Sequence, residues 1–286
     1  MLTLAGAAWL LPDHSLQAAV DRDKIDLDRL IEFAQRCNDC YHDHETFKRE
    51  YGAQVEVGEF PVSGLRIYLD ANPKGEGQWV ILRGTANFPD VIEDLDFVGE
   101  SEHELGIHVH TGFDKSLQEC LPWLVPRLDR SRPVWVTGHS LGGAVAELLM
   151  ATLELRGFKD VSGVTFGQPK LTDARGVERL AHLNLLRVVH HRDPVPMLPP
   201  VFVEVGHLGI YHHSGPELII QLDGKTTHLL RHLADRLDIR SYWSDMRNID
   251  PFDHDMTKGY LPALKRAREL GQLTSHRHRV SAPSNP

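Results

Sequence analysis

The hydrophobic positions of this chain change period several times, and each change predicts a new element. Residues 13–50 carry apolar side chains at helical spacing and predict a helical segment. Alternating patterns at 54–60 and 64–69 predict two strands, and the apolar run at 79–82 predicts a buried strand. The amino-terminal part of the chain is therefore predicted to pass from helix into sheet.

Beyond residue 100, strand patterns and helix patterns alternate. Further buried strands are predicted to end near 110 and to lie at 134–136, 161–166 and 185–189, with helices between them. Late hairpin or edge strands are expected at 201–210 and 217–222, helix and loop at 226–248, and a final helix from 253 to about 273. Strands alternating with helices predict an α/β fold with a mostly parallel sheet and helices on both faces.

Two segments are harder to assign. Residues 86–97 place four apolar side chains on one face of a short helix, namely Phe88, Val91, Ile92 and Leu95. That face either packs on the core or forms a lid over an apolar site. Residues 1–20 contain an apolar run without a positively charged start, which favours a packed segment over an export signal and leaves the localisation open. We predict one domain over 1–274, with a disordered tail at 275–286.

Composition narrows the possible partners. The 286 residues carry a net charge of −9 with no basic stripe, so nucleic acid is not expected as a partner. No apolar run is long enough to span a bilayer. Cys37 and Cys40, followed by His42 and His44, invite a zinc interpretation, but no second ligand pair at the usual spacing follows them. We expect helix packing there, and no metal.

The most informative stretch is Gly138-His139-Ser140-Leu141-Gly142, a G-x-S-x-G pentapeptide between a buried strand and an Ala- and Leu-rich helix. Such a strand–turn–helix sequence predicts a nucleophile elbow, in which the serine Oγ is exposed above the sheet edge. A side chain at either glycine would collide with the neighbouring strand or with the turn. The amino terminus of the following helix favours a developing oxyanion beside the serine.

A serine nucleophile needs a base to take its proton and an acid to orient that base. Asp193 follows a predicted strand and is locked between prolines, so it suits the acid. His254 lies at a loop-to-helix junction downstream of the rest and suits the base, because the expected chain order is Ser, Asp, His. Position alone leaves His207, His212 and His213 open as alternatives.

Six ordered motifs over roughly residues 60–265 resemble the class 3 lipase family of fungal triacylglycerol lipases and their bacterial relatives. They are Leu82-Arg83-Gly84-Thr85, His110-Thr111-Gly112-Phe113, Val136 to Ala144, Phe166-Gly167-Gln168-Pro169, Asp193 to Pro200, and Asp253-His254 with Tyr260. The resemblance implies an α/β-hydrolase fold with a short helical lid at 86–97. It also implies a serine hydrolase that needs no cofactor or metal.

Carried over residue by residue, the resemblance implies Ser140 as nucleophile, Asp193 as acid and His254 as base. It implies an oxyanion hole formed by Thr85 and the backbone N–H of Leu141. His213, in a His-x-x-x-Glu context, would be structural. The implied substrate is an acylglycerol ester, met at an oil–water interface. Phospholipase A1, short-chain carboxylesterase and a non-catalytic lipase-like binding protein remain alternatives.

Overall fold

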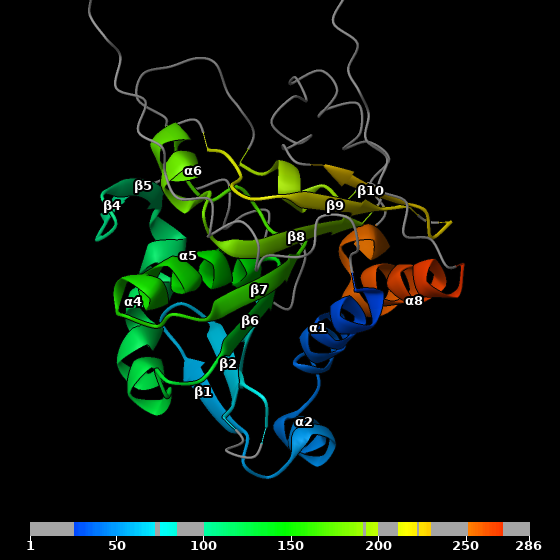
Figure 1. Ribbon diagram of the computed structural model, residues 1–286, viewed down its shortest axis with the longest axis horizontal. Helices are drawn as coiled ribbons and strands as arrows, with labels where there is room; N and C mark the ends of the chain where they lie inside the picture. Colours follow the sequence, from blue (N-terminus) through cyan, green and yellow to red (C-terminus); the bar gives the residue numbers. More distant parts are fainter. Residues whose placement is uncertain are drawn as a thin grey trace, which may run out of the picture.

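The computed structural model describes residues 26–71, 75–84, 100–190, 193–199, 211–221, 223–229 and 251–270. Within them, an eight-stranded sheet has the order β1-β2-β3-β6-β7-β8-β9-β10 (Figure 1). Its strands are β1 (Glu56–Phe60), β2 (Leu65–Asp70), β3 (Gln78–Arg83), β6 (Val134–His139), β7 (Val161–Phe166), β8 (Asn184–His190), β9 (Glu217–Ile220) and β10 (Thr226–Leu229). Neighbouring strands from β3 to β9 pair in parallel, and the outer strands pair antiparallel. The prediction of a mostly parallel sheet is confirmed.

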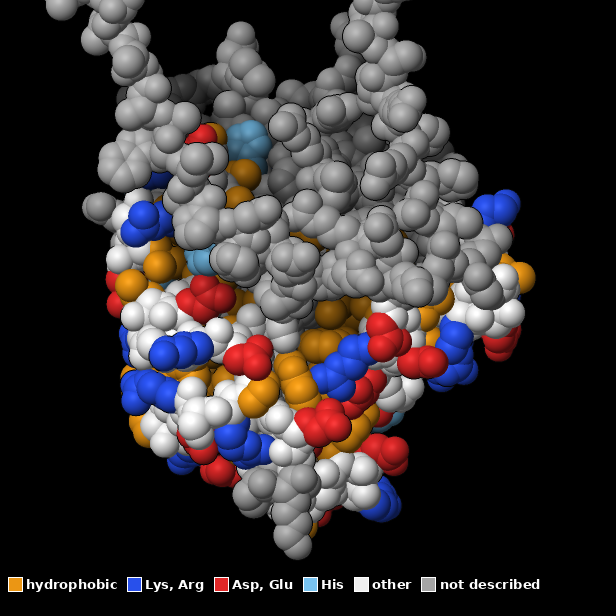
Figure 2. Space-filling view, viewed as in Figure 1, with side chains coloured by type: hydrophobic (Ala, Val, Ile, Leu, Met, Phe, Trp, Pro, Cys, Tyr) orange, Lys and Arg blue, Asp and Glu red, His pale blue; other side chains and the backbone are white. Residues whose placement is uncertain are grey.

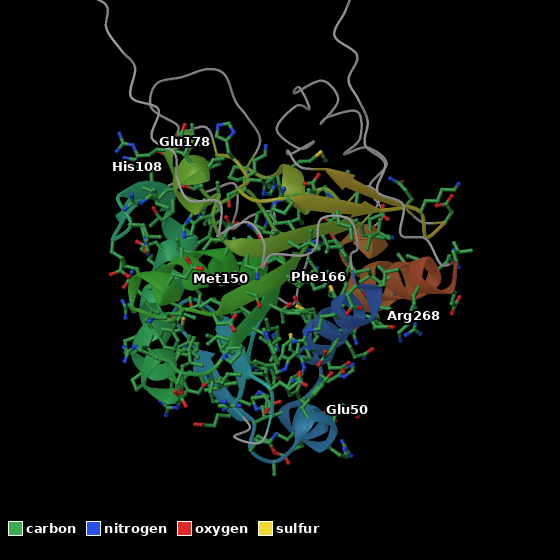
Figure 3. All side chains as sticks on the ribbon, viewed as in Figure 1. Glu50, His108, Met150, Phe166, Glu178 and Arg268 are labelled. Atoms are coloured by element: carbon green, nitrogen blue, oxygen red, sulfur yellow. The ribbon has the colours of Figure 1, made fainter. Side chains whose placement is uncertain are left out.

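Helices cover both faces of the sheet (Figure 1). On one face lie α4 (Thr111–Leu124) and α5 (Leu141–Leu155), and on the other lie α1 (Leu27–Asp39) and α8 (Leu261–Glu269). Strand side chains alternate between the two cores: Val80 and Leu82 of β3 pack with α5, whereas Trp79 and Ile81 pack with α1. Figure 3 labels Met150 of α5 in the first core and Phe166 of β7 in the second.

The segment predicted to be helical at 13–50 is helical over most of its described residues, but not as one helix. Its described part divides into α1 and α2 (His44–Tyr51), because Asp43 accepts a hydrogen bond from the Thr46 N–H and starts a new helix. Asp26 caps α1 in the same way. The break leaves Tyr41 in the short connection between the two helices.

Two strand assignments also differ from the prediction. Residues 226–229 form β10 instead of helix or loop, because they complete an antiparallel pair with β9. The strand ending at residue 110 is β5 (Ile107–His110), which pairs with β4 (Glu100–His103) in a separate two-stranded sheet and also forms an isolated bridge to Thr172. A further described helix, α6 (Ala174–Leu180), lies between β7 and β8, where a helix is predicted.

Several predictions lie outside the described residues, namely the amino-terminal segment 1–25, the lid at 86–97, the hairpin strand at 201–210 and the tail at 275–286. Among the helices that are described, none is long and apolar enough to cross a membrane. In the view of Figure 2, acidic and basic side chains alternate over the described surface without forming a patch of one sign.

Candidate active site

Ser140 lies between the end of β6 and the start of α5, on a strained turn. Its φ of 60° makes it the single non-glycine residue with positive φ in the described part of the chain. Its N–H donates to Phe166 O at 2.9 Å, and its carbonyl accepts from Gly143 N at 2.9 Å. Backbone strain of this kind costs about 1–3 kcal/mol and clusters at functional sites. The predicted strand–turn–helix geometry is therefore present.

Close backbone packing explains the two glycines of the pentapeptide. A Cβ on Gly138 would lie 2.1 Å from Gly142 O, and one on Gly142 would lie 2.4 Å from Leu82 O. Gly84 at the end of β3 is equally confined, because its Cβ would lie 2.5 Å from His139 O and 3.1 Å from the Ser140 Cβ. The strand end before residue 85 thus lies directly against the serine.

The Ser140 hydroxyl is not used for structure. The side chains at the amino-terminal caps of α1, α2 and α6 accept hydrogen bonds from first-turn N–H groups, whereas Ser140 makes no such bond at the start of α5. The sequence predicts an exposed Oγ, and this is wrong: the Oγ is buried, and it has no hydrogen-bond partner among the described residues. A buried hydroxyl left in this state costs free energy and is a typical sign of function.

Asp193 and His254 form a buried pair. His254 Nδ1 lies 3.0 Å from Asp193 Oδ1 and 2.9 Å from Oδ2, and the side chains are 6% and 0% exposed. A carboxylate only accepts, so Nδ1 carries the proton and Nε2 is the basic nitrogen of the neutral ring. The predicted acid and the predicted base are thus brought together.

The Asp193 carboxylate has two further donors. Val195 N–H donates to Oδ1 at 2.9 Å, and the Tyr260 hydroxyl makes a short hydrogen bond to Oδ2. Burial, reinforced by the charge of Asp193, raises the pKa of Tyr260 well above 10.0, so the phenol stays protonated and keeps donating. Tyr260 comes from the π-helical turn η5 (Met256–Tyr260), which precedes α8.

Gly167 connects the pair to the elbow. It follows Phe166, which holds the Ser140 N–H, and has a φ of +55°. A Cβ on Gly167 would lie 2.6 Å from Asp193 Oδ2 and 3.0 Å from the His254 ring. The Phe-Gly-Gln-Pro motif therefore needs glycine at this position for two reasons, its backbone conformation and the close approach of Asp193 and His254.

Sequence reasoning missed a role for His139 and Tyr41. His139 Nε2 lies 2.7 Å from the His254 carbonyl oxygen, so Nε2 donates and Nδ1 accepts from the Tyr41 hydroxyl at 2.8 Å. Burial, followed by the charge that His254 can carry, lowers the pKa of His139 well below 6.5. The ring is therefore neutral. No sequence pattern marks Tyr41, which lies in a predicted helix.

The other predicted residues divide into three groups. Leu141 opens α5, so its backbone N–H is in the first turn beside Ser140. His213 donates from Nε2 to Pro196 O at 2.7 Å. Thr85, Phe88, Val91, Ile92, Leu95 and the alternative base His207 lie outside the described residues.

The cysteine-rich stretch of α1 packs behind the elbow. Cys37 Sγ lies 3.3 Å from Thr137 Oγ1, and Cys40 Sγ donates to Cys37 O at 3.0 Å. Burial raises the pKa of the Cys37 thiol to about 12, so it is not a thiolate at neutral pH. Across the described ranges, no group of three or more His, Cys, Asp or Glu side chains is arranged to hold a metal ion.

Comparison with known proteins agrees with the geometry. Residues 79–203 match the sequence model of the family Lipase (class 3). Over this region the chain is similar to class 3 lipases. Among its relatives, the secreted mono- and diacylglycerol lipase 2 of Gibberella zeae is 32% identical over 176 residues, and its counterpart lipase 1 of Fusarium solani is 31% identical over 172. These alignments cover 48% and 54% of this chain, but only 41% and 47% of the relatives.

Solved structures of fungal lipases show the same fold. The triacylglyceride lipase of Rhizomucor miehei superposes with a TM-score of 0.59 at 21% identity, covering 69% of this chain and 82% of that one. The mono- and diacylglycerol lipase of Aspergillus oryzae gives 0.58 at 20% identity, covering 69% and 80%. The predicted α/β-hydrolase fold is therefore confirmed.

Proposed function

We propose that this protein belongs to the class 3 lipase family and is a serine-dependent carboxylic ester hydrolase that acts on acylglycerols. The observation that carries the proposal is the pairing of His254 Nδ1 with the Asp193 carboxylate at 2.9 Å, at the sheet end that presents Ser140. A strained serine whose Oγ has no partner among the described residues suits a nucleophile and has no evident structural use.

In the proposed mechanism, His254 Nε2 removes the Ser140 proton as Oγ forms a bond to the ester carbonyl carbon. The carbonyl π electrons move to oxygen and give a tetrahedral oxyanion. Its collapse breaks the bond to the alcohol oxygen, which leaves with the proton now on His254. Water then attacks the acyl carbon and gives a proton to His254. The bond from that carbon to Ser140 Oγ breaks, Oγ takes the proton from His254, and the acid leaves.

The oxyanion is assigned to the start of α5 and the end of β3. The Ser140 side chain makes no capping hydrogen bond at the start of α5. The helix dipole favours negative charge beside the Leu141 N–H in this first turn. The resemblance adds Thr85, which follows Gly84, and Gly84 lies against Ser140. One preorganised donor of this type is worth about 3–4 kcal/mol in the transition state.

The acylglycerol substrate is inferred from the relatives. Two of them are named for hydrolysis of mono- and diacylglycerols, and a structural neighbour is a triacylglyceride lipase. The apolar face of residues 86–97, formed by Phe88, Val91, Ile92 and Leu95, suits a lid that opens at an oil–water interface. Replacing Phe88 and Ile92 by Ser should then flatten the rise in rate above the substrate's solubility limit.

The test is hydrolysis of p-nitrophenyl esters from acetate to palmitate, of an emulsified triglyceride and of a phosphatidylcholine emulsion, by wild type and Ser140→Ala. Ser140-dependent release of fatty acid from long esters and triglyceride supports the proposal. Activity on short soluble esters alone would make the protein a carboxylesterase, and release from phospholipid alone would make it a phospholipase A1. Hydrolysis of none of them would favour a binding protein.

A further inference from the structure

Two short segments meet at the carboxyl end of β8, and each contributes one histidine and one aspartate. The strand end supplies His190 and Asp193, and the 3-10 turn η4 (Pro251–His254) supplies Asp253 and His254. Asp193 contacts His254, and His190 Nδ1 lies 3.1 Å from Asp253 O and 3.5 Å from Asp253 Oδ1. Two His–Asp pairs therefore join the segments. In one pair the strand end supplies the aspartate, and in the other it supplies the histidine.

The second pair has a defined hydrogen-bond direction. Because a carbonyl oxygen only accepts, His190 Nδ1 carries a proton and donates it to the backbone of Asp253. The side chains of His190 and Asp253 are 2% and 8% exposed, so water competes little for this contact. His190 is the last residue of β8, and its carbonyl accepts from Asp193 N at 2.9 Å, which fixes the turn that carries the acid.

The chain position of Asp253 makes the contact relevant to the site. It directly precedes His254, and its backbone carbonyl is held by His190 while the next carbonyl, of His254, is held by His139 at 2.7 Å. A four-residue 3-10 turn has few internal hydrogen bonds, so contacts from outside determine its orientation. A displacement of about 1 Å in a reacting group costs about 100-fold in rate.

We propose that His190 and Asp253 are positioning residues, which hold the η4 turn so that His254 keeps both its contact with Asp193 and its reach to Ser140. This inference rests on the proposed function of the same site. It assigns the Asp253–His190 pair to the alignment of the base, in addition to Asp193, which orients the ring of His254, the residue that transfers the proton.

The charged and titratable groups around the two histidines are few in the described residues. Asp193, Asp253, Tyr260 and His139 face His254 from the loop after β8, its own turn, η5 and β6. His190 faces Asp253 and the Tyr260 ring, whose centroid is 5.5 Å from its own. Burial keeps the pKa of Tyr260 well above 10.0, so the phenol adds no charge near neutral pH.

Three substitutions of His190 test the proposal. His190→Asn places an amide N–H near the Nδ1 position and keeps the donor, whereas His190→Gln places its amide near Nε2 and His190→Ala removes both. On enzyme counted by active-site titration, His190→Ala and His190→Gln should lower kcat about 10- to 100-fold with little change in KM, and His190→Asn should recover most of it. A variant that is only less stable would show normal kcat per titrated site.

The pH profile gives a second readout. The Asp193 carboxylate stabilises the protonated form of His254, so a loosened η4 turn weakens that stabilisation. The acidic limb of kcat/KM should therefore move to lower pH in His190→Ala and His190→Gln, but not in His190→Asn. A move to higher pH in all three would instead mean that a positive charge on His190 acts on the base directly, and would overturn the positioning role.

A third readout does not depend on catalysis. The proton between His254 Nδ1 and Asp193 gives a low-field NMR resonance, identified by its loss in His254→Ala. It should shift or broaden in His190→Gln and remain in His190→Asn. If wild type hydrolyses no ester, this resonance still decides the positioning role. If wild type is active and all His190 variants match it, only the positioning role is overturned. Should His190→Ala fail to fold, the Asn and Gln pair carries the comparison.

Discussion

Two buried serines on or near α5 differ in whether their hydroxyl groups form hydrogen bonds. Ser140 begins α5 and has a strained backbone and an Oγ without a partner among the described residues. Ser214 is equally buried, but its hydroxyl makes a short hydrogen bond to Glu147, two turns further along α5. Glu147 also accepts a short hydrogen bond from Gln168, and the buried Arg187 lies nearby.

The Ser214 hydroxyl is used for structure, whereas the Ser140 hydroxyl is left for chemistry. In the Ser214 cluster, made of Ser214, Glu147 and Gln168, hydroxyl, carboxylate and amide are partners of one another, so its members serve to hold α5 against the loops. Around Ser140, the Asp193 carboxylate and the His254 imidazole are partners, but the hydroxyl has no partner among the described residues. Residue types alone do not distinguish the two clusters, whereas satisfaction of the hydroxyl and backbone strain do.

Apart from loss of the Ser140 nucleophile, the largest expected effect comes from changing the acid. Asp193→Asn keeps the size of the side chain but turns an acceptor of several hydrogen bonds, including those from His254 and Tyr260, into an amide with one acceptor oxygen. The wrong His254 tautomer should then lower kcat about 10⁴-fold. Circular dichroism confirms that the variant is folded. A loss below about tenfold would exclude Asp193 as the acid.

The next effect tests the strained elbow itself. Gly138→Ala places a Cβ 2.1 Å from Gly142 O, and a backbone atom cannot move aside without shifting the turn. We expect a loss of about 1–3 kcal/mol in the free energy of unfolding and a large loss of ester hydrolysis. Gly112→Ala is the matched control, because its Cβ meets only the His110 ring, at 3.2 Å. Equal behaviour of the two variants in urea denaturation would contradict the steric account.

Ser214→Ala tests whether the Ser214 cluster is separate from the Ser140 site. It leaves Glu147 with one donor fewer in a buried site, so the free energy of unfolding should fall by about 1–3 kcal/mol. Turnover per titrated site should stay close to that of wild type. Ser140→Ala should do the reverse, with nearly unchanged stability and no turnover. Loss of turnover per site in Ser214→Ala would show that the two clusters are not separate.

The smallest effect is a pH dependence of stability. Burial raises the pKa of Glu147 above its usual 4.5, outweighing the donors Ser214 and Gln168 and the charge of Arg187. The folded protein therefore binds this proton more tightly than the unfolded chain, and the contribution of Glu147 to stability falls as pH rises above 4.5. Glu147→Gln removes this dependence. The free energy of unfolding of Glu147→Gln, relative to that of wild type, should rise as the pH rises above 4.5. A difference between the two that does not change with pH would contradict the assignment.

The sequence predicts the parts of the fold and site that rest on local pattern. Alternating strands and helices predict the parallel sheet, and the pentapeptide predicts the elbow, because both follow from periodicity and steric rules. Chain order and the resemblance predict Asp193 as acid and His254 as base. In the structure, His254 Nδ1 lies 2.9 Å from Asp193 Oδ2. Whether Thr85 completes the oxyanion hole stays a prediction.

What the sequence does not predict depends on contacts between distant segments. The hydrogen bond from Tyr41 to His139 joins residues 98 apart, and that from His190 to Asp253 joins residues 63 apart. The sequence predicts helix or loop at residues 226–229. They form β10 instead, because pairing with β9 outweighs their local preference. The break before α2 was missed, although Asp43 is an ordinary cap residue.

The most direct test of the central claim is covalent labelling with a long-chain alkyl fluorophosphonate, followed by peptide mass mapping. The reagent loses fluoride when an activated serine Oγ attacks phosphorus, so it reports the nucleophile without a substrate assay. We predict one adduct per chain, on Ser140, in wild type and in Ser214→Ala, and no adduct in Ser140→Ala. An unlabelled wild type, or an adduct that persists in Ser140→Ala, would contradict the account.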